Sequence, residues 1–230
     1  MPNIIHIETS TEVCSVALSS DGVVKFHRQD FEGPSHAALL GGFVQDCIAF
    51  ARENKIELHA VAVSGGPGSY TGLRIGVSEA KGLCFGLNLP LIAVSTLELL
   101  CCTAMFRVDV EPDALICPMI DARRMEVYAA VYDECLQPVM PVGAYVVDEN
   151  TFAEVLSQRK VIFCGNGAAK CREVINHHNA IFVDGVYPLA TGMLALAERA
   201  FSRQEFCDVA YYEPFYLKEF VATTPKNKVI

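Results

Sequence analysis

One order of strands and helices occurs twice along this chain. In the first half, apolar runs predict three strands, the last two joined at Asp21-Gly22, a dipeptide typical of hairpin turns. A helix, a strand, a helix, a strand and a helix follow, as the spacing of apolar residues indicates. The expected strands are 3–8, 13–19, 23–28, 60–64 and 91–94, and the expected helices are 35–53, 71–86 and 95–106.

The second half repeats this order after VDVEPD, a polar joint at residues 108–113. Each half reads βββαβαβα, although no residue-level repeat accompanies the repeated order. The expected strands are 114–120, 125–132, 143–147, 161–164 and 180–183, and the expected helices are 150–158, 168–178 and 190–202.

This order predicts an α/β fold of two lobes, 1–107 and 108–230. In each lobe a mixed sheet is flanked by helices, with its first three strands antiparallel and its later strands parallel through right-handed crossovers. Two such halves resemble the actin-like, sugar-kinase and ribonuclease-H-like (ASKHA) architecture. That likeness of fold assigns no function.

The composition limits the class of protein. The 230 residues are 52% hydrophobic and carry a formal charge of −9. The negative charge argues against a chain that binds nucleic acid by itself, because contacts with phosphate need Lys and Arg. No run reaches the roughly 18 apolar residues of a membrane span. The N-terminus has no signal-peptide pattern, and ten cysteines without one suggest reduced thiols. We therefore expect a cytoplasmic protein with no membrane contact and no bound metal.

The stretch SGGPGSYTGLRIGV (64–77) follows an apolar strand and leads into a helix. It is not a Walker A loop, because no glycine in it is followed at the required spacing by Gly-Lys-Ser/Thr. Free backbone N–H groups at the start of a helix favour an anion. The alternative is that the glycines serve a tight turn and close backbone packing, and the residues alone leave both open.

The helix after this stretch has small residues at a four-residue spacing: Gly72, Gly76 and Ala80, with Gly82 and Gly86 beside them. A glycine inside a helix costs about 1 kcal/mol relative to alanine. Close approach of another helix is the simplest compensation. Packing within this chain and an interface with a second chain fit this pattern equally well.

Two carboxylates occupy the ends of the first strands of the two halves, Glu8 and Asp121. In actin-like ATPases, acidic residues at such positions help to hold metal and phosphate, and two carboxylates at one cleft suit Mg²⁺ bound through water. Turn capping is the alternative role. The candidate phosphate or nucleotide contacts are Glu8, Thr9, Ser10, Gly66, Gly68, Asp121, Gly165 and Gly167.

Other catalytic templates are absent from the sequence. It has neither a GxSxG elbow nor an HExxH or HxxxH pair, and no nucleophile with its base is apparent. We therefore name no catalytic residue.

Four passages carry a resemblance to a known family: 6–18, 64–83, 118–130 and 213–218. They resemble the TsaB (YeaZ) family, whose members are paralogues of TsaD. The resemblance spans essentially the whole chain and implies two actin-like lobes. TsaD transfers a threonylcarbamoyl group to the adenosine next to the anticodon of tRNA.

The resemblance also implies that this chain is a non-catalytic partner. TsaD-type sequences carry a metal-binding HxxxH where this chain has Thr96 and Leu100, and neither side chain suits a transition metal. TsaB-like proteins pair with TsaD through two helices of the first lobe, here 35–53 and 71–86. The implied interface residues are Ser35, His36, Leu39, Leu40, Phe43, Val44, Cys47, Gly72, Arg74, Ile75, Gly76, Glu79 and Ala80.

The implied assembly contains TsaD and TsaE, with ATP or ADP and metal present in the complex rather than on this chain alone. Contact with tRNA is indirect, and a homodimer through the same helices is implied when TsaD is absent. The tail from about residue 203 is expected to fold back on the first lobe. Tyr70 stands where the family often has Phe, and Lys218 where it usually has Arg. The rival function is a stand-alone actin-like ATPase or small-molecule kinase.

Overall fold

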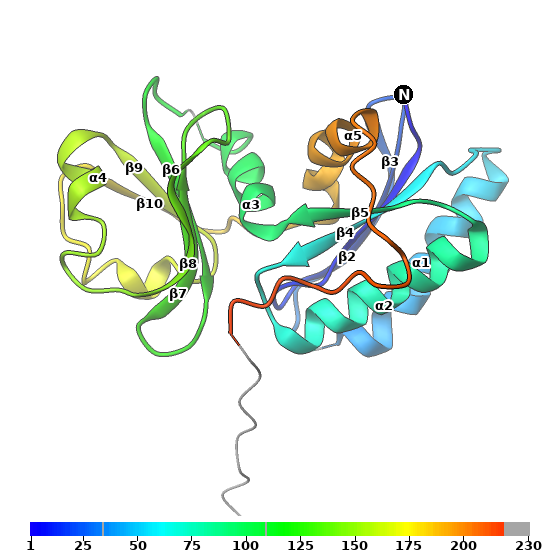
Figure 1. Cartoon of the computed structure of the whole chain (residues 1–230), viewed down its shortest axis with the longest axis horizontal. Helices are drawn as coiled ribbons and strands as arrows, with labels where there is room; N and C mark the ends of the chain where they lie inside the picture. The colour runs from blue at the N-terminus through cyan, green and yellow to red at the C-terminus, as the bar shows by residue number, and fades with distance from the viewer. Residues whose placement is uncertain (34, 109, 219–230) are drawn as a thin grey trace, which may run out of the picture.

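The structure is a computed structural model that describes residues 1–33, 35–108 and 110–218. Two five-stranded sheets lie side by side, each with its own helices (Figure 1). The α/β fold of two mixed sheets predicted from the repeated order is confirmed.

The first sheet has the strand order β3-β2-β1-β4-β5. β1 pairs antiparallel with β2, and β2 pairs antiparallel with β3, whereas β1, β4 and β5 run parallel. β1 is buried along its whole length because it has neighbours on both edges and helices over both faces. The strand bounds are β1 Ile4–Glu8, β2 Cys14–Ser20, β3 Val23–Asp30, β4 Ala60–Gly66 and β5 Leu91–Ser95.

Helices α1 (His36–Glu53) and α2 (Tyr70–Leu87) cover one face of the first sheet and touch each other. Their buried side chains pack with Ile5, Ile7 and Val16 of the sheet in one core. α3 (Thr96–Met105) lies between the two lobes (Figure 1). Leu99 of α3 packs into the first-lobe core and Leu97 into the second.

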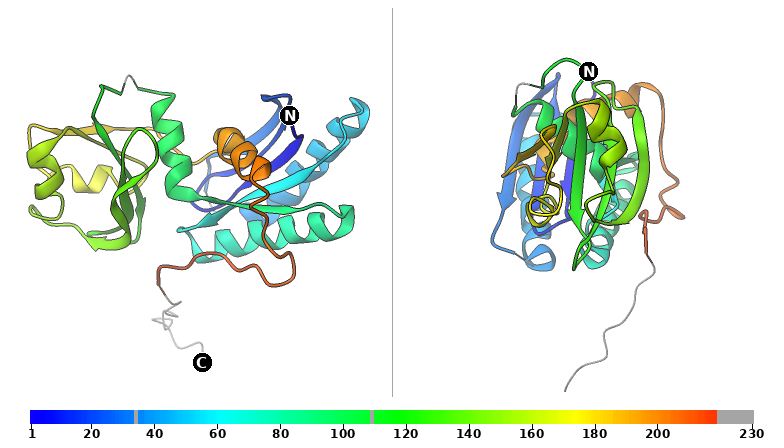
Figure 2. Two further views of the ribbon diagram at one scale, coloured as in Figure 1. Left: turned by 45° about the horizontal axis from the view of Figure 1, so that its top comes forward. Right: turned by 90° about the vertical axis from the view of Figure 1, so that its left-hand side faces the viewer.

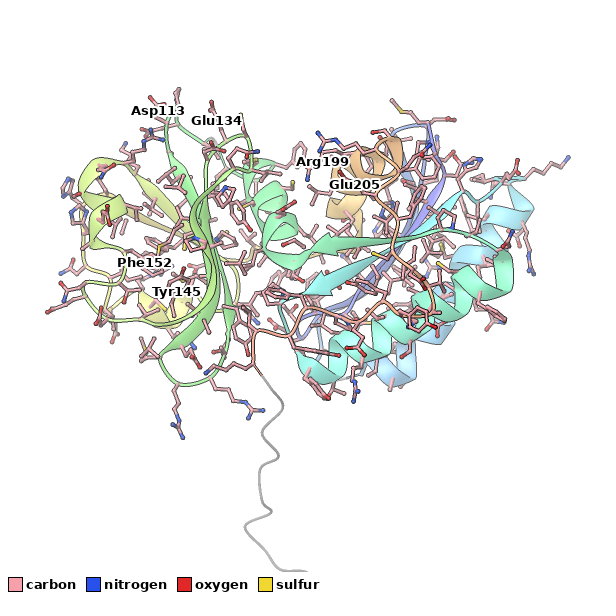
Figure 3. All side chains as sticks on the ribbon, in the orientation of Figure 1. Asp113, Glu134, Tyr145, Phe152, Arg199 and Glu205 are labelled. Carbon is pink, nitrogen blue, oxygen red and sulfur yellow. The ribbon has the colours of Figure 1, made fainter. Side chains whose placement is uncertain are left out.

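The second sheet repeats the first, with the order β10-β9-β6-β7-β8. Phe152 enters its core beside Tyr145, the two ring centroids being 6.1 Å apart (Figure 3). The bounds are β6 Leu115–Asp121, β7 Glu126–Tyr132, β8 Pro138–Val146, α4 Ala153–Gln158, β9 Val161–Cys164 and β10 Ala180–Val183.

The helix expected at 168–178 is wrong. Only a single 3₁₀ turn, η1 (Ala169–Cys171), forms there. Cys171 and Ile175 reach the core from this turn and the one after it. The following Asn-His-His-Asn run is poor in helix formers, so nothing extends the helix toward β10.

The last helix belongs to the first lobe in space. After η2 (Ala190–Met193), α5 (Leu194–Ser202) packs against the face of the first sheet that α1 and α2 leave uncovered. Arg199 of α5, labelled in Figure 3, pairs with Glu98 of α3 at 3.1 Å. The boundary drawn at 107/108 puts 190–202 in the second lobe, and this placement is corrected because the apolar face of the first sheet needs the cover.

The tail after α5 runs along the first lobe to the junction of the two lobes (Figure 2). Cys207 bridges to Leu91 at the edge of β5, and Lys81 of α2 donates to the carbonyls of Ala210 and Tyr212 at 3.0 and 3.1 Å. Residues 219–230 of the expected tail lie outside the described residues. Within the part of the chain that is described, no helix is long and apolar enough to cross a membrane.

Candidate functional site

Gly72 and Gly76 of α2 face the turn between β1 and β2. A Cβ at Gly72 would collide with the carbonyl oxygen of Thr9, and one at Gly76 with the Thr9 hydroxyl. That hydroxyl donates a 2.8 Å hydrogen bond to the Gly72 carbonyl. Ala80 is buried in the first-lobe core. The assignment of Gly72, Gly76 and Ala80 to a partner interface is therefore wrong, because packing inside the lobe requires these small residues.

The β1–β2 turn also packs against the start of α2. A Cβ at Gly68 would collide with the backbone of Ser10. The amide of Ser69 donates to the Ser10 carbonyl at 2.7 Å, and the Ser69 hydroxyl accepts from the Gly72 amide at 3.2 Å. These amides are the donors that an anion at a helix start would need. The protein itself already uses these two amides, which does not favour an anion at this helix start, and the phosphate contact stays a prediction.

The other two glycines of the loop face the C-terminal tail. A Cβ at Gly65 would lie 2.5 Å from the Tyr212 hydroxyl, and one at Gly66 would lie 2.5 Å from the Phe215 carbonyl. Gly66 also has a φ of +103°, which side chains rarely adopt. The loop therefore holds a segment of its own chain, and the close-packing alternative explains its glycines.

Glu8 lies inside the first lobe and is fully buried. Its Oε1 atom accepts a 2.5 Å hydrogen bond from the Ser10 amide. Burial raises the pKa of Glu8 to about 7, an effect that hydrogen bonds from Ser10 and Ser64 reduce. Thr9 and Ser10 are buried with it, in the turn that packs on α2. Glu8 therefore lies enclosed in the first lobe at the base of this turn.

Asp121 is exposed at the lobe junction. It forms an ion pair with Lys170, and its amide donates to the Asn166 side chain at 3.0 Å. Asn166 in turn donates to Glu12 of the first lobe at 2.6 Å, so this network joins the two lobes. No hydrogen bond or ion pair between described residues joins Asp121 to Glu8. The expectation that the two carboxylates face one cleft stays a prediction, and the complete burial of Glu8 does not favour it.

The glycines beside Asp121 are explained by close packing. Gly165, with a φ of +92°, lies against the carbonyl of Met119. A Cβ at Gly167 would lie 3.0 Å from the Asp121 amide. Across residues 1–33, 35–108 and 110–218, no group of three or more His, Cys, Asp or Glu side chains could hold a metal ion.

The predicted interface residues divide between the core and the surface. His36 is buried, with its Nε2 atom 2.8 Å from the Thr11 carbonyl, and Leu40, Val44 and Cys47 belong to the core, so these four are corrected. Ser35 occupies the N-cap position of α1, but its hydroxyl bonds to Asp30 at 2.8 Å instead of to the helix. The candidates with exposed or partly exposed side chains are Ser35, Leu39, Phe43, Arg74, Ile75 and Glu79.

Other residues on the solvent side of α1 and α2 were not among the interface residues that the resemblance implies, although Gly82 and Gly86 were noted in the sequence. Gly41, Gly42, Gly82 and Gly86 have open space where a Cβ would be. Phe85, between the last two, is 87% exposed. We call this surface, with the partly exposed candidates Leu39, Phe43, Ile75 and Glu79, the outer helix face. The sequence did hold a signal for this surface, because Gly82 and Gly86 are four residues apart and so lie on one side of α2.

A groove of about 400 Å³ runs between the two helices of the outer helix face. It is lined by Gly41, Val44, Gln45, Ile48, Ala49, Arg52, Glu79 and Leu83. A second, mostly apolar hollow adjoins it at Ile48 and Arg52. This face therefore combines a concave surface, open glycines and an exposed aromatic ring.

Comparisons with known proteins agree on one family. A family model described as tRNA N6-adenosine threonylcarbamoyltransferase (TsaD) matches residues 32–226. The tRNA threonylcarbamoyladenosine biosynthesis protein TsaB of Escherichia coli is 32% identical, covering 95% of this chain and 96% of that protein. The chain belongs to the TsaB family. The TsaB of Haemophilus influenzae is 27% identical, and the match covers 95% of this chain and 94% of that protein.

Solved structures give the same result for the TsaB fold. YeaZ from Pseudomonas aeruginosa superimposes with a TM-score of 0.75 at 27% identity, covering 94% of this chain and 100% of that one. A second Pseudomonas aeruginosa structure, described as similar to peptidase YeaZ, gives a TM-score of 0.79 at 27% identity, with 95% and 100% covered. The two actin-like lobes expected of the TsaB family are thereby confirmed.

Proposed function

We propose that this chain is the non-catalytic subunit that pairs with a TsaD-type transferase in the biosynthesis of threonylcarbamoyladenosine in tRNA. The names of its relatives and the match to a TsaD family model support the pathway. TsaE, ATP or ADP, and metal belong to the complete assembly in this proposal. The protein works in the cytoplasm, and a homodimer uses the same face when TsaD is absent.

The observation that carries the proposal is the outer helix face. A helix-interior glycine costs about 1 kcal/mol relative to alanine, and no packing among the described residues requires Gly41, Gly42, Gly82 or Gly86. Phe85 of α2 is 87% exposed and adds apolar surface that is poorly placed in water. A helix from a second chain would approach closely over the glycines and cover the ring.

The chemistry of the residues supports a non-catalytic role. Thr96 and Leu100 stand where TsaD-type sequences have two histidines, and both are buried. A threonine hydroxyl is a poor ligand for a transition metal, and leucine has no donor atom. The residues present therefore do not fit the metal of a TsaD-type site, and we assign no reaction step to this chain.

Co-purification with the TsaD of the same organism, followed by light scattering, tests the proposal. We expect a heteromer with the wild-type chain and none with Gly82→Leu, because the added side chain stands where the partner helix would pack. Ala195→Leu is the matched control, since Ala195 is an exposed helix residue on α5, away from the outer helix face. If the wild-type chain forms no heteromer under any nucleotide condition, the proposal is overturned. If the isolated chain binds nucleotide with magnesium and Asp121→Ala abolishes that binding, the ATPase function is favoured instead.

A further inference from the structure

The hairpin between β6 and β7 carries two arginines in an unfavourable backbone conformation. Arg123 has a φ of +71° and Arg124 a φ of +51°. Side chains rarely adopt this region, which glycine and asparagine occupy at lower cost. Both arginines are exposed. Asn and Gly would make this turn more easily, so the turn alone does not explain two arginines.

The acids next to these arginines are already neutralised. Asp121 pairs with Lys170, which also donates to the Glu126 carbonyl at 2.7 Å. The Glu126 carboxylate binds Lys218 of the tail at 2.5 Å. Within the described part of the chain, the guanidinium groups of Arg123 and Arg124 form no ion pair and no hydrogen bond. Their charge therefore faces solvent uncompensated.

The end of the tail brings further cations and two aromatic rings to the same edge. The tail reaches the lobe junction along α2 (Figures 1 and 2). There Tyr216 lies on Tyr70, with ring centroids 4.8 Å apart, and the Arg74 guanidinium lies 4.8 Å from the centre of the Tyr70 ring. Lys218, two residues after Tyr216, makes the bond to Glu126.

We call Arg74, Arg123, Arg124, Lys170 and Lys218 the junction patch. It joins both lobes and the tail. Its two lysines are paired with Glu126 and Asp121, so its excess positive charge is that of the three arginines. Glu12, through Asn166, and Glu213, next to Tyr216, border it. The whole chain carries a formal charge of −9, so this concentration of positive charge contrasts with the rest of the sequence.

We propose that the junction patch binds the phosphodiester backbone of RNA, so that this subunit contacts the tRNA substrate directly. The proposal rests on the proposed function, which supplies the tRNA, and it departs from the indirect contact expected from the sequence. Guanidinium groups match phosphate oxygens with paired hydrogen bonds. Tyrosine rings among cations can also stack on unpaired RNA bases. An acidic protein surface would make no use of such stacking, so the rings favour RNA as the partner.

Binding of an unmodified tRNA transcript tests this inference. The variant is Arg123→Asn with Arg124→Gly, which removes both charges and suits the positive φ values. Fluorescence anisotropy is measured at several salt concentrations, with the isolated full chain and with the TsaD heteromer. We expect roughly tenfold weaker binding near 0.1 M salt, and a slope of log K against log salt smaller by about two.

The matched control is Lys55→Gly with Arg159→Asn. It removes two exposed charges elsewhere and also relieves one positive φ, since Lys55 has a φ of +55°. We expect control and wild type to bind RNA alike, and both variants to melt no lower than wild type.

Two results would overturn the inference. One is equal affinity and equal salt slope for the junction variant and its control. The other is loss of TsaD pairing by the junction variant while RNA binding of the isolated chain is unchanged, which would assign the patch to an acidic protein surface. Failure of the wild-type chain to pair with TsaD would contradict the proposed function alone, because RNA binding is also measured without TsaD.

Discussion

The amide of Phe215 donates a 2.7 Å hydrogen bond to the carbonyl of Gly65. The two residues lie in two of the four passages that resemble the TsaB family, 213–218 and 64–83. These passages are far apart in the sequence but meet in space, where the Tyr212 hydroxyl also approaches Gly65. The glycine stretch and the tail are therefore the two halves of one contact.

Enlarging Gly65 tests this contact. We expect Gly65→Ala to destabilise the protein by about 1–3 kcal/mol, because its Cβ would lie 2.5 Å from the Tyr212 hydroxyl oxygen. Tyr212→Phe in the Gly65→Ala background should recover part of that loss, since it removes the colliding oxygen. Urea unfolding of the two single variants and the double variant measures the coupling. Additive effects would show that the tail does not press on Gly65.

Two glycines of α2 should respond in opposite ways to the same substitution. Gly76→Leu should destabilise or unfold the chain, because the side chain would collide with Thr9. Gly82→Leu has open space and should stabilise the isolated chain by up to about 1 kcal/mol. Circular dichroism and urea unfolding distinguish the two variants. A folded, fully stable Gly76→Leu would contradict the packing of α2 on the β1–β2 turn.

Glu8 should make stability fall as the pH rises. Its pKa is about 7 in the folded state against an ordinary value of 4.5, so the folded protein keeps a proton that the unfolded chain releases. The stability due to this proton is complete below pH 4.5 and is lost as the pH rises to about 7, on the order of 3 kcal/mol. Glu8→Gln should flatten this decline in urea unfolding between pH 4.5 and 8. An unchanged decline would show that Glu8 is not its source.

His6 should act in the opposite direction. Burial lowers its pKa from 6.5 to about 3, and its Nε2 atom lies 2.8 Å from the Ser19 hydroxyl oxygen. The unfolded chain binds a proton below pH 6.5 that the folded protein does not, so stability falls as the pH drops from 6.5 toward 3. His6→Gln should make this acid loss shallower. Unfolding midpoints between pH 3.5 and 7 provide the measurement, and identical slopes for both proteins would contradict a neutral buried His6.

The sequence predicted the strands and the first helices because hydrophobic periodicity reports which side of an element is buried. The exception is the start of β8, which begins at Pro138 rather than at the expected residue 143. α1 and α2 begin and end within one residue of their expected bounds, 35–53 and 71–86. The side on which a helical glycine lies is harder to predict, because a residue without a side chain adds little to that pattern. Gly76 and Gly82 look alike in the sequence, yet one faces Thr9 and the other faces solvent.

Contacts between distant segments could not be predicted from local patterns. The placement of α5 follows from an uncovered face of the first sheet, which is a property of the assembled sheet. Arg123 and Arg124 lie within a passage used for the family resemblance, but their positive φ values depend on the hairpin geometry. Glu8 and Asp121 occupy equivalent strand ends, and only the three-dimensional packing separates a buried carboxyl from an exposed one.

The position of α5 has a consequence for synthesis on the ribosome. The last strand of the first sheet ends at Ser95, but the helix that covers one of its faces begins at Leu194. At roughly 5–20 residues per second, translation of the intervening segment takes about 5–20 seconds. During that interval the nascent first lobe exposes an apolar sheet face, which is a natural substrate for a ribosome-associated chaperone. The second lobe, encoded in between, has all its strands before the first lobe is complete.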